Sequence, residues 1–316
     1  MEWKRKKRES FMQRACNQKS SNKKTTVVLL KKKLYSYEDM KKDLEELRKR
    51  YGSILEVNVL DKTADQRNVY CIRLGNPLAE RCFIVDVALH GREWHNTQVF
   101  MKALENYCRN FQKRYKGKCY QQVSDKVCLY FLPMMNPDGV SISQYGASAI
   151  KDNRLRKALM AMPKESYYRW KANARGIDLN RNFQTHFEEN SVKQPAAQEY
   201  GGENPLSEPE TRALVRLIYK VHPKAVIHYH EAGSIIYYEK YSFIIRILHQ
   251  ITKYPLRKEI KPASGCLSTW LEKEGICSCT VETCKGIAPV PHWQVYPVYL
   301  RNHKLFIEVM NLNFQQ

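Results

Sequence analysis

The amino-acid sequence predicts an α/β sandwich, a sheet of buried strands with helices packed on both faces. Two strand-like runs, at 82–89 and 127–132, are apolar almost throughout, as strands covered on both faces should be. Helix-like segments alternate with such runs along the chain, which is typical of this fold class. The 316 residues, 43% of them hydrophobic, are enough for one large α/β domain or two small ones.

The first predicted helix begins after Ser36. Ser36 is a favourable N-cap residue, and acidic residues follow it in what would be the first helical turn. Met40, Leu44, Leu47 and Tyr51 then recur at helical spacing. One apolar face of this helix should therefore pack inward.

Strands and helices alternate from there to the C-terminus. Apolar runs predict strands at 54–60, 69–74, 82–89, 127–132, 225–230 and 276–282. Helices are predicted at 94–115, 208–219, 241–248, 268–273 and 299–312. The segment 144–205 is polar and irregular, and a loop of this length in a compact domain is often functional.

The chain carries a formal net charge of +21, and its first 34 residues are especially basic. Because blocks of like charge usually form solvated tails, residues 1–34 are predicted to be a poorly ordered basic tail, followed by one domain over 35–316. A charge of this size also predicts non-specific attraction to polyanions. No recognised nucleic-acid-binding motif accompanies it, so specific nucleic acid binding is not expected.

The ten cysteines follow no disulfide or zinc-finger spacing. Cys277, Cys279 and Cys284 form one cluster, but a structural zinc site needs four ligands and no partner pair is visible, so a core strand is favoured there. Free cysteines fit a reducing compartment. The sequence has no recognisable signal peptide and no apolar run of about 18 residues, so we expect a cytoplasmic rather than a secreted protein, without a transmembrane segment.

His90 and Glu93 lie where a predicted buried strand gives way to a helix. A histidine and a glutamate at this spacing can turn toward one point when the chain curls into the helix. Zinc accepts imidazole nitrogen and carboxylate oxygen, and a catalytic zinc site uses three protein ligands and a water. His228 and His230 are the candidates for the third ligand, and His230 lies nearer the strand end, where ligands of open α/β sheets gather.

Three more residues suggest peptide chemistry. Glu282 closes the predicted strand 276–282, and a carboxylate buried there, beside a zinc site, is suited to act as a general base. Arg181 can bind a carboxylate with two hydrogen bonds while Asn180 donates beside it, as recognition of a peptide C-terminus requires. Taken alone, each also fits an ordinary structural role, as a surface glutamate or a loop salt bridge.

Several motifs occur in a characteristic order along the chain. They are His90-Gly-Arg-Glu93-Trp, Asn136-Pro-Asp-Gly139, Gly176-Ile-Asp-Leu-Asn-Arg-Asn-Phe183 and Ser207-Glu-Pro-Glu210, followed by His230 and Glu282. In this combination, residues 35–316 resemble the zinc carboxypeptidase family, whose carboxypeptidase A-like fold is a mixed sheet between helices.

The resemblance implies one zinc ion per chain, held by His90, Glu93 and His230, with Glu282 as the catalytic base. It further implies that the terminal carboxylate of the substrate is bound by three residues of this chain, namely Asn180, Arg181 and Arg92.

The chain departs from the family pattern at three places. Lys171 or Arg175 stands in for the arginine that polarises the scissile carbonyl, and Lys171 is the preferred candidate. Lys261 and Pro262 lie where digestive members have a tyrosine that closes over the substrate. Ser268 lies at the expected floor of the specificity pocket, and it supports a preference for neither aromatic nor basic C-terminal residues.

Two stretches, 170–176 and 230–238, look closer to bacterial members of the family. Several of those are similar to γ-D-glutamyl-meso-diaminopimelate peptidases, which cut peptidoglycan stem peptides. We therefore expect a zinc metallocarboxypeptidase that hydrolyses a peptide bond near a substrate C-terminus, with peptidoglycan-derived peptides as candidate substrates. A general peptide carboxypeptidase is the alternative. A non-enzymatic binding module on the same fold is disfavoured because the ligands and the base are all present.

Overall fold

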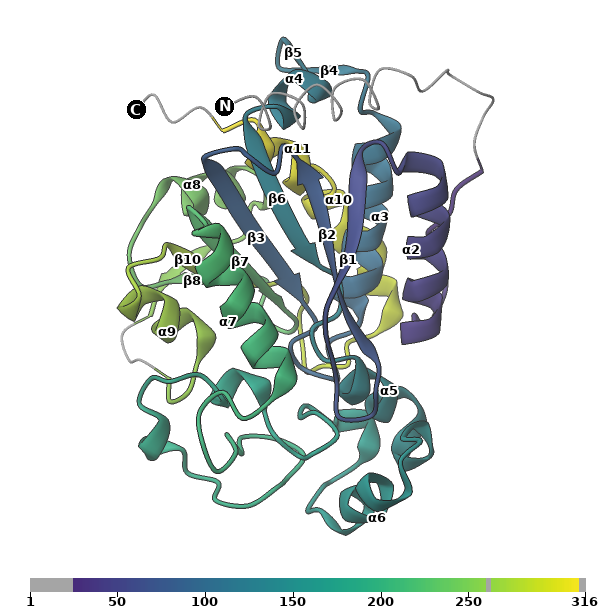
Figure 1. Ribbon diagram of the computed structural model, residues 1–316, viewed down its shortest axis with the longest axis vertical. Helices are drawn as coiled ribbons and strands as arrows, with labels where there is room; N and C mark the ends of the chain where they lie inside the picture. Colours follow the sequence, from purple (N-terminus) through teal and green to yellow (C-terminus); the bar gives the residue numbers. More distant parts are fainter. Residues whose placement is uncertain (1–24, 260–262, 313–316) are drawn as a thin grey trace.

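The computed structural model describes residues 25–259 and 263–312 (Figure 1). Its main sheet has eight strands in the order β1-β2-β6-β3-β7-β10-β8-β9. These strands are β1 (Leu55–Lys62), β2 (Asn68–Gly75), β3 (Arg81–Val87), β6 (Val127–Leu132), β7 (Ala225–His230), β8 (Ile235–Tyr238), β9 (Leu256–Lys258) and β10 (Ser278–Glu282). The central strands β6, β3, β7 and β10 are parallel, whereas β1, β2 and β8 form antiparallel pairs, so the sheet is mixed.

Helices pack on both faces of this sheet, as predicted (Figure 1). One face carries α2 (Tyr37–Tyr51), α3 (His95–Arg109), α8 (Phe243–Thr252), α10 (Val295–Asn302) and α11 (Leu305–Met310). The opposite face carries α7 (Pro209–Val221) and α9 (Leu267–Lys273). The remaining elements are α4 (Tyr120–Ser124), α5 (Pro137–Tyr145), α6 (Asn153–Ala161) and a small hairpin of β4 (Arg114–Tyr115) and β5 (Lys118–Cys119).

The apolar central strands divide their side chains between two cores. In β3, Phe83, Val85 and Val87 join the core under α3, while Ile84 joins the core under α7. This alternation follows from the two-residue period of a strand. A strand buried on both faces must therefore be apolar at successive positions, which is the pattern that predicted β3 and β6.

The predicted N-cap of α2 is confirmed. The Ser36 hydroxyl accepts a hydrogen bond from the backbone N–H of Asp39, and the Asp39 carboxylate accepts one from the Ser36 N–H. This reciprocal pair is a capping box. Met40, Leu44, Leu47 and Tyr51 are all buried, as their spacing predicts.

The structure differs from the predicted elements at several places. The helix predicted at 94–115 ends at Arg109, and the helix predicted at 299–312 is two helices, α10 and α11. The segment 144–205 contains α6, and Trp170 packs there in a small separate core with Ile142 and Leu159. The strands β8 and β9 were not predicted, because runs as short as Leu256–Lys258 carry too few residues for a periodic pattern.

Residues 25–34 differ from the prediction of a poorly ordered tail. Val28 is fully buried in the main core, and the backbone N–H groups of Val27 and Val28 donate to the Glu105 carboxylate in α3. Gln98 donates to the backbone carbonyl groups of Leu29 and Lys32. Apolar burial and these hydrogen bonds attach this segment to α3 in spite of its charge. The rest of the predicted tail, residues 1–24, lies outside the described residues.

Within the described ranges, no helix is long and apolar enough to span a membrane. The nine cysteines of these ranges are free thiols. Cys279 is a buried core residue of β10. This agrees with the interpretation of the cluster at Cys277, Cys279 and Cys284 as part of a core strand.

Candidate active site

The turn after β3 carries His90 and Glu93. Ala88 has a left-handed backbone (φ 54°), and the next element is α3, which begins at His95. Gly91 packs directly on Gly139: a Cβ atom at Gly91 would lie 2.5 Å from the Gly139 backbone, so this contact requires glycine. The Gly91 N–H donates to the Lys171 carbonyl at 2.8 Å.

The Asn136-Pro-Asp-Gly motif holds this turn from the other side. Asn136 caps α5 by accepting from the Gly139 N–H, and its amide donates to the Leu89 carbonyl at 3.2 Å. The Asn136 backbone N–H donates to the Ala88 carbonyl. The motif therefore positions the turn that carries His90.

His230, at the end of β7, meets His90 and Glu93 in space. His90 Nδ1 lies 2.8 Å from Glu93 Oε1, and His230 Nδ1 lies 2.9 Å from Glu93 Oε2. The two Nδ1 atoms are 3.1 Å apart. All three side chains are buried. In the part of the chain that the structure describes, this is the one group of three such residues whose ligand atoms converge.

The donor set fits zinc. Ligand atoms at tetrahedral zinc lie about 3.4 Å from one another, and the observed separations are only slightly shorter. Two imidazole nitrogens and one carboxylate are also a ligand combination that catalytic zinc sites use. His90 Nε2 lies 3.5 Å from Asp178 Oδ1, which matches the carboxylate–histidine arrangement that orients metal-binding imidazoles.

Glu93 and His230 shift each other's pKa in opposite directions. Burial lowers the pKa of His230, but the Glu93 carboxylate outweighs burial and raises that pKa to about 9. Burial raises the pKa of Glu93, but the two imidazoles lower it well below its usual range. The ionised Glu93 carboxylate therefore supplies the negative charge of this group, and a metal ion would bind in place of the proton on His230.

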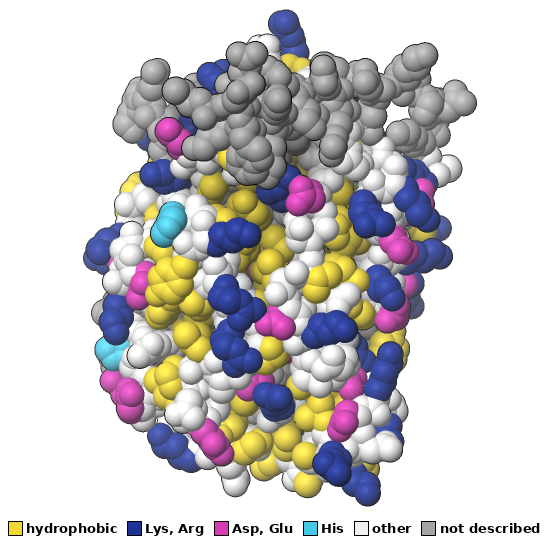
Figure 2. Space-filling model, in the orientation of Figure 1, with side chains coloured by type: hydrophobic (Ala, Val, Ile, Leu, Met, Phe, Trp, Pro, Cys, Tyr) yellow, Lys and Arg dark blue, Asp and Glu magenta, His cyan; other side chains and the backbone are white. Residues whose placement is uncertain are grey.

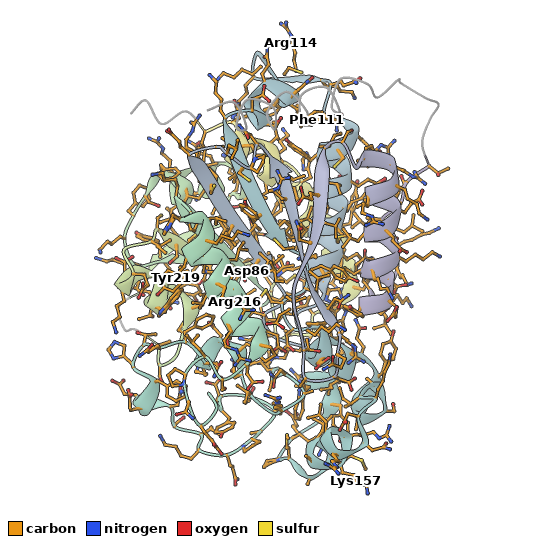
Figure 3. The ribbon with its side chains drawn as sticks, viewed as in Figure 1. Asp86, Phe111, Arg114, Lys157, Arg216 and Tyr219 are labelled. Atoms are coloured by element: carbon orange, nitrogen blue, oxygen red, sulfur yellow. The ribbon has the colours of Figure 1, made fainter. Side chains whose placement is uncertain are left out.

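The other candidate ligand, His228, lies deeper in the sheet. Its Nδ1 is 2.5 Å from Asp86 Oδ2, on the adjacent strand β3, where Asp86 and His228 are register partners. Asp86 is labelled in Figure 3 among the central strands. His228 is thus paired with Asp86 and is not part of the converging group.

Glu282 lies beside the triad because β10 runs parallel to β7. Glu282 is the register partner of His230, and its Oε2 is buried without a hydrogen-bond partner among the described residues. Gly233 makes room for it, since a Cβ atom there would lie 2.6 Å from Glu282 Cβ. Burial raises the pKa of Glu282 to about 8, although His230 opposes that shift.

Asn180 and Arg181 form a short turn over Leu179–Arg181. Asn180 Oδ1 accepts from the Leu267 backbone N–H at 3.0 Å, so its amide NH₂ is the part that can donate to a ligand. Arg181 donates through Nε and Nη2 to Glu199 Oε2, at 2.9 and 2.7 Å, and through Nη1 to the Asn180 carbonyl.

Lys171 is the buried cation of this group. Its Nζ lies 2.8 Å from Asp178 Oδ2 and 3.0 Å from Glu199 Oε1. Burial lowers the pKa of Lys171, but these two carboxylates outweigh burial and raise it, so the side chain stays protonated. The alternative cation, Arg175, is half-exposed and lies 3.6 Å from Glu208.

Arg92 and Ser268 are the remaining predicted substrate-binding residues. Arg92 donates to the Gln198 side chain at 3.1 Å, while its buried Nε has no partner within the described ranges. Ser268 is buried in α9, 3.1 Å from Cys266 Sγ. Asn180 bonds to Leu267, the residue before Ser268, so α9 adjoins the Arg181 turn. Lys261 and Pro262 lie outside the described residues.

Two site residues had no role assigned from the sequence. Asp178 contacts both His90 and Lys171, and it accepts from the Asn180 and Glu199 N–H groups. Because Asp178 belongs to the Asp-Leu-Asn-Arg motif, the sequence could have indicated that it has a role in the site. Glu199 lies far from that motif along the chain and had no local signal.

The profile of the zinc carboxypeptidase family, peptidase M14, matches residues 40–284. The chain belongs to the zinc carboxypeptidase family. The predicted family, the carboxypeptidase A-like fold and the assignment as a peptidase are therefore confirmed. The family is zinc-dependent, and the converging histidines and glutamate form a possible metal-binding triad.

Relatives of this chain include a bacterial endopeptidase and an uncharacterized bacterial protein, YqgT. It is 28% identical over 287 residues to gamma-D-glutamyl-L-diamino acid endopeptidase 1 of Lysinibacillus sphaericus, covering 86% of this chain and 71% of that protein. It is 26% identical over 250 residues to YqgT of Bacillus subtilis, covering 74% of this chain and 66% of that protein.

Solved structures show the same fold. Carboxypeptidase A from Helicoverpa armigera superposes with a TM-score of 0.64 at 18% identity, covering 96% of this chain and 81% of that one. Murein-tripeptide amidase MpaA from Escherichia coli O157 superposes with a TM-score of 0.56 at 20% identity, covering 82% of this chain and 93% of that one.

Proposed function

We propose that this member of the zinc carboxypeptidase family binds one zinc ion at His90, Glu93 and His230 and hydrolyses a peptide bond near the C-terminus of its substrate, with Glu282 as the general base. The observation that carries the proposal is the convergence of these ligands with Glu282 held opposite His230 on the next strand. A partly buried carboxylate whose Oε2 lacks a hydrogen-bond partner among the described residues, beside a metal-binding group, is placed to exchange protons rather than to stabilise the fold.

Each residue has a distinct task in this mechanism. A bound zinc ion supplies Lewis-acid chemistry, which polarises a carbonyl group and makes water acidic enough to react near neutral pH. In its ionised form, which the positive charge of a bound zinc ion would favour, Glu282 takes a proton from the attacking water and passes it to the leaving amine. Lys171 contributes fixed positive charge that stabilises the negative charge developing on the carbonyl oxygen.

The substrate terminus is bound by the neighbouring donors. Arg181 and Asn180 bind the terminal carboxylate, and Arg92 assists with its positive charge. Asp178 orients His90 and holds Lys171 in place. Ser268 contributes a neutral polar group to the pocket beside them.

A peptidoglycan stem peptide is the proposed substrate. The support is the Lysinibacillus sphaericus relative, a gamma-D-glutamyl-L-diamino acid endopeptidase by name. A general peptide carboxypeptidase is the alternative, and the choice is tested by mass spectrometry of the zinc-loaded protein with peptides that end in each residue type and with γ-D-glutamyl-diaminopimelate stems. Release of diaminopimelate alone supports the stem peptide; release of ordinary C-terminal residues supports the alternative.

The mechanism is tested with Glu282→Gln, which removes the base but keeps the shape of the side chain. We expect this variant to bind one zinc ion per chain by elemental analysis and to lose at least about 1,000-fold in kcat, as loss of general base catalysis predicts. His90→Ala is the matched variant, and it should lose zinc as well as activity. Normal turnover by Glu282→Gln would contradict the assigned base, and a full zinc content in His90→Ala would contradict the assigned ligands.

A further inference from the structure

Glu199 forms an ion pair with Arg181, the residue to which the proposed function assigns the substrate carboxylate. Its Oε2 accepts from Nε and Nη2 of Arg181, and its Oε1 lies 3.0 Å from Lys171 Nζ. The side chain is 36% exposed, so one side of the carboxylate remains open to a ligand. A carboxylate offers about four acceptor positions, of which these contacts use three.

The backbone holds Glu199 in this position. Glu199 has a left-handed backbone (φ 66°), which is uncommon for a residue other than glycine. Its N–H donates to Asp178 Oδ2 at 3.2 Å, and the preceding residue, Gln198, accepts from Arg92. The conformation is thus fixed by residues of the site itself, as expected where strain serves a function.

Arg181 can still bind a carboxylate while it contacts Glu199. A guanidinium has five N–H donors, and Glu199 uses the two on the Nε–Nη2 edge, while the Asn180 carbonyl uses one on Nη1. By this count Nη1 and Nη2 each keep one further N–H donor. A substrate carboxylate can therefore bind next to the Glu199 carboxylate rather than in place of it.

The charge balance makes a plain carboxylate an incomplete ligand here. Burial raises the pKa of Glu199, but Lys171 and Arg181 outweigh burial and lower that pKa, so Glu199 is ionised. Lys171 is then paired with Asp178 and Glu199, and Arg181 with Glu199. An added carboxylate gains from Arg181 and Arg92 but is repelled by Glu199, unless the ligand also brings a positive charge.

We infer that Glu199 is a specificity-determining residue, which accepts an ammonium group of the substrate beside the carboxylate bound by Arg181. The inference rests on the proposed function and names its substrate class more closely. In the last residue of a peptide, the α-nitrogen belongs to the scissile bond and carries no charge. The ammonium must therefore come from the side chain, so the substrate ends in a diamino acid.

Diaminopimelate suits this arrangement because its side chain ends in an ammonium group, while its α-carboxylate remains free to bind Arg181. Ser268, at the neighbouring helix, supplies no charge of its own, whereas Glu199 supplies a partly exposed carboxylate.

The test compares two substrates that differ by one ammonium group. They are γ-D-glutamyl-meso-diaminopimelate and the same dipeptide ending in 2-aminopimelate. We expect the wild-type kcat/KM to favour the diaminopimelate substrate by about tenfold or more, the range of one hydrogen bond to a charged group. In Glu199→Gln this ratio should fall toward one. Glu203→Gln is the matched control, since it removes an exposed carboxylate from the same segment and should keep the wild-type ratio.

Calorimetric binding of the same two dipeptides to Glu282→Gln gives a second readout that does not depend on turnover, and adding Glu199→Gln to that variant should remove the preference for the diaminopimelate dipeptide. A wild-type ratio near one, or an unchanged ratio in Glu199→Gln, overturns the inference and leaves the proposed function standing. An equal fall in kcat/KM for both substrates in Glu199→Gln also overturns the inference, because Glu199 would then only orient Arg181 and Lys171. A wild-type enzyme that cleaves neither substrate but trims ordinary peptides overturns the proposed substrate and the inference together.

Discussion

Glu210 is fully buried, and neither oxygen of its carboxylate has a hydrogen-bond partner in the described part of the chain. Burial, and then the nearby charges of Asp138 and Glu208, raise the pKa of Glu210 well above its usual range. This carboxyl group is therefore protonated in the folded protein at a pH where it is ionised in the unfolded chain. It lies apart from the proposed catalytic residues.

The stability of the protein should consequently depend on pH through Glu210. A raised pKa in the folded state means that this residue favours folding at low pH and that the benefit is lost as pH rises through the folded pKa. Glu210→Gln cannot ionise, so its melting temperature relative to wild type should increase between pH 5 and pH 9. The measurement is thermal unfolding of both proteins across that range. A constant difference at every pH would contradict the assignment.

At the scale of a single element, α2 illustrates how a local signal acts. Ser36 and Asp39 satisfy each other's backbone N–H groups, and the helix starts where this pair forms. Such signals involve neighbours in sequence, so they can be predicted without knowledge of the fold. Short elements such as β9 form because neighbouring strands pair with them, and no local pattern reveals them.

Ser36→Ala removes the acceptor for the Asp39 N–H and should lower the free energy of unfolding by about 1 kcal/mol. Ser36→Thr keeps the hydroxyl group and serves as the control, with a smaller expected loss. Urea unfolding followed by circular dichroism measures both. If alanine and threonine had equal effects, the hydroxyl group would not be the source of the stability.

At the scale of the whole molecule, the N-terminal segment and the surface charge need different explanations. In Figure 2, lysine and arginine side chains are spread over the visible face among hydrophobic and acidic ones, rather than gathered in one patch. The basic segment before α2 nonetheless contributes Val28 to the core. Its composition predicted a solvated tail because charge dominates the local pattern, while the apolar contact is made with distant residues.

Val28→Ala tests whether this segment is part of the folded domain. Loss of two buried methyl groups should lower the free energy of unfolding by about 2 kcal/mol. Leu29→Ala alters an exposed side chain in the same segment, and a change within about 0.5 kcal/mol is expected. Chemical denaturation of the two variants provides the comparison. Equal, negligible effects would show that the segment does not support the domain.

The sequence by itself determined the fold class, the family and the candidate residues, because these depend on periodicity and on short motifs with fixed spacing. His90 and Glu93 are close along the chain, and a strand end followed by a helix was enough to indicate them. Glu282 was found because it closes an apolar strand.

Only the tertiary structure decided which groups meet. His230 joins the triad and His228 pairs with Asp86 because parallel pairing of β3 with β7 sets which residues face one another. Glu199 contacts Arg181 and Lys171 through a loop whose path depends on contacts with Asp178 and Arg92. Such contacts join residues far apart in sequence, and their geometry arises only when the chain is folded. The candidate metal ligands were thus readable from the sequence, whereas the contacts of Glu199 with Arg181 and Lys171 were not.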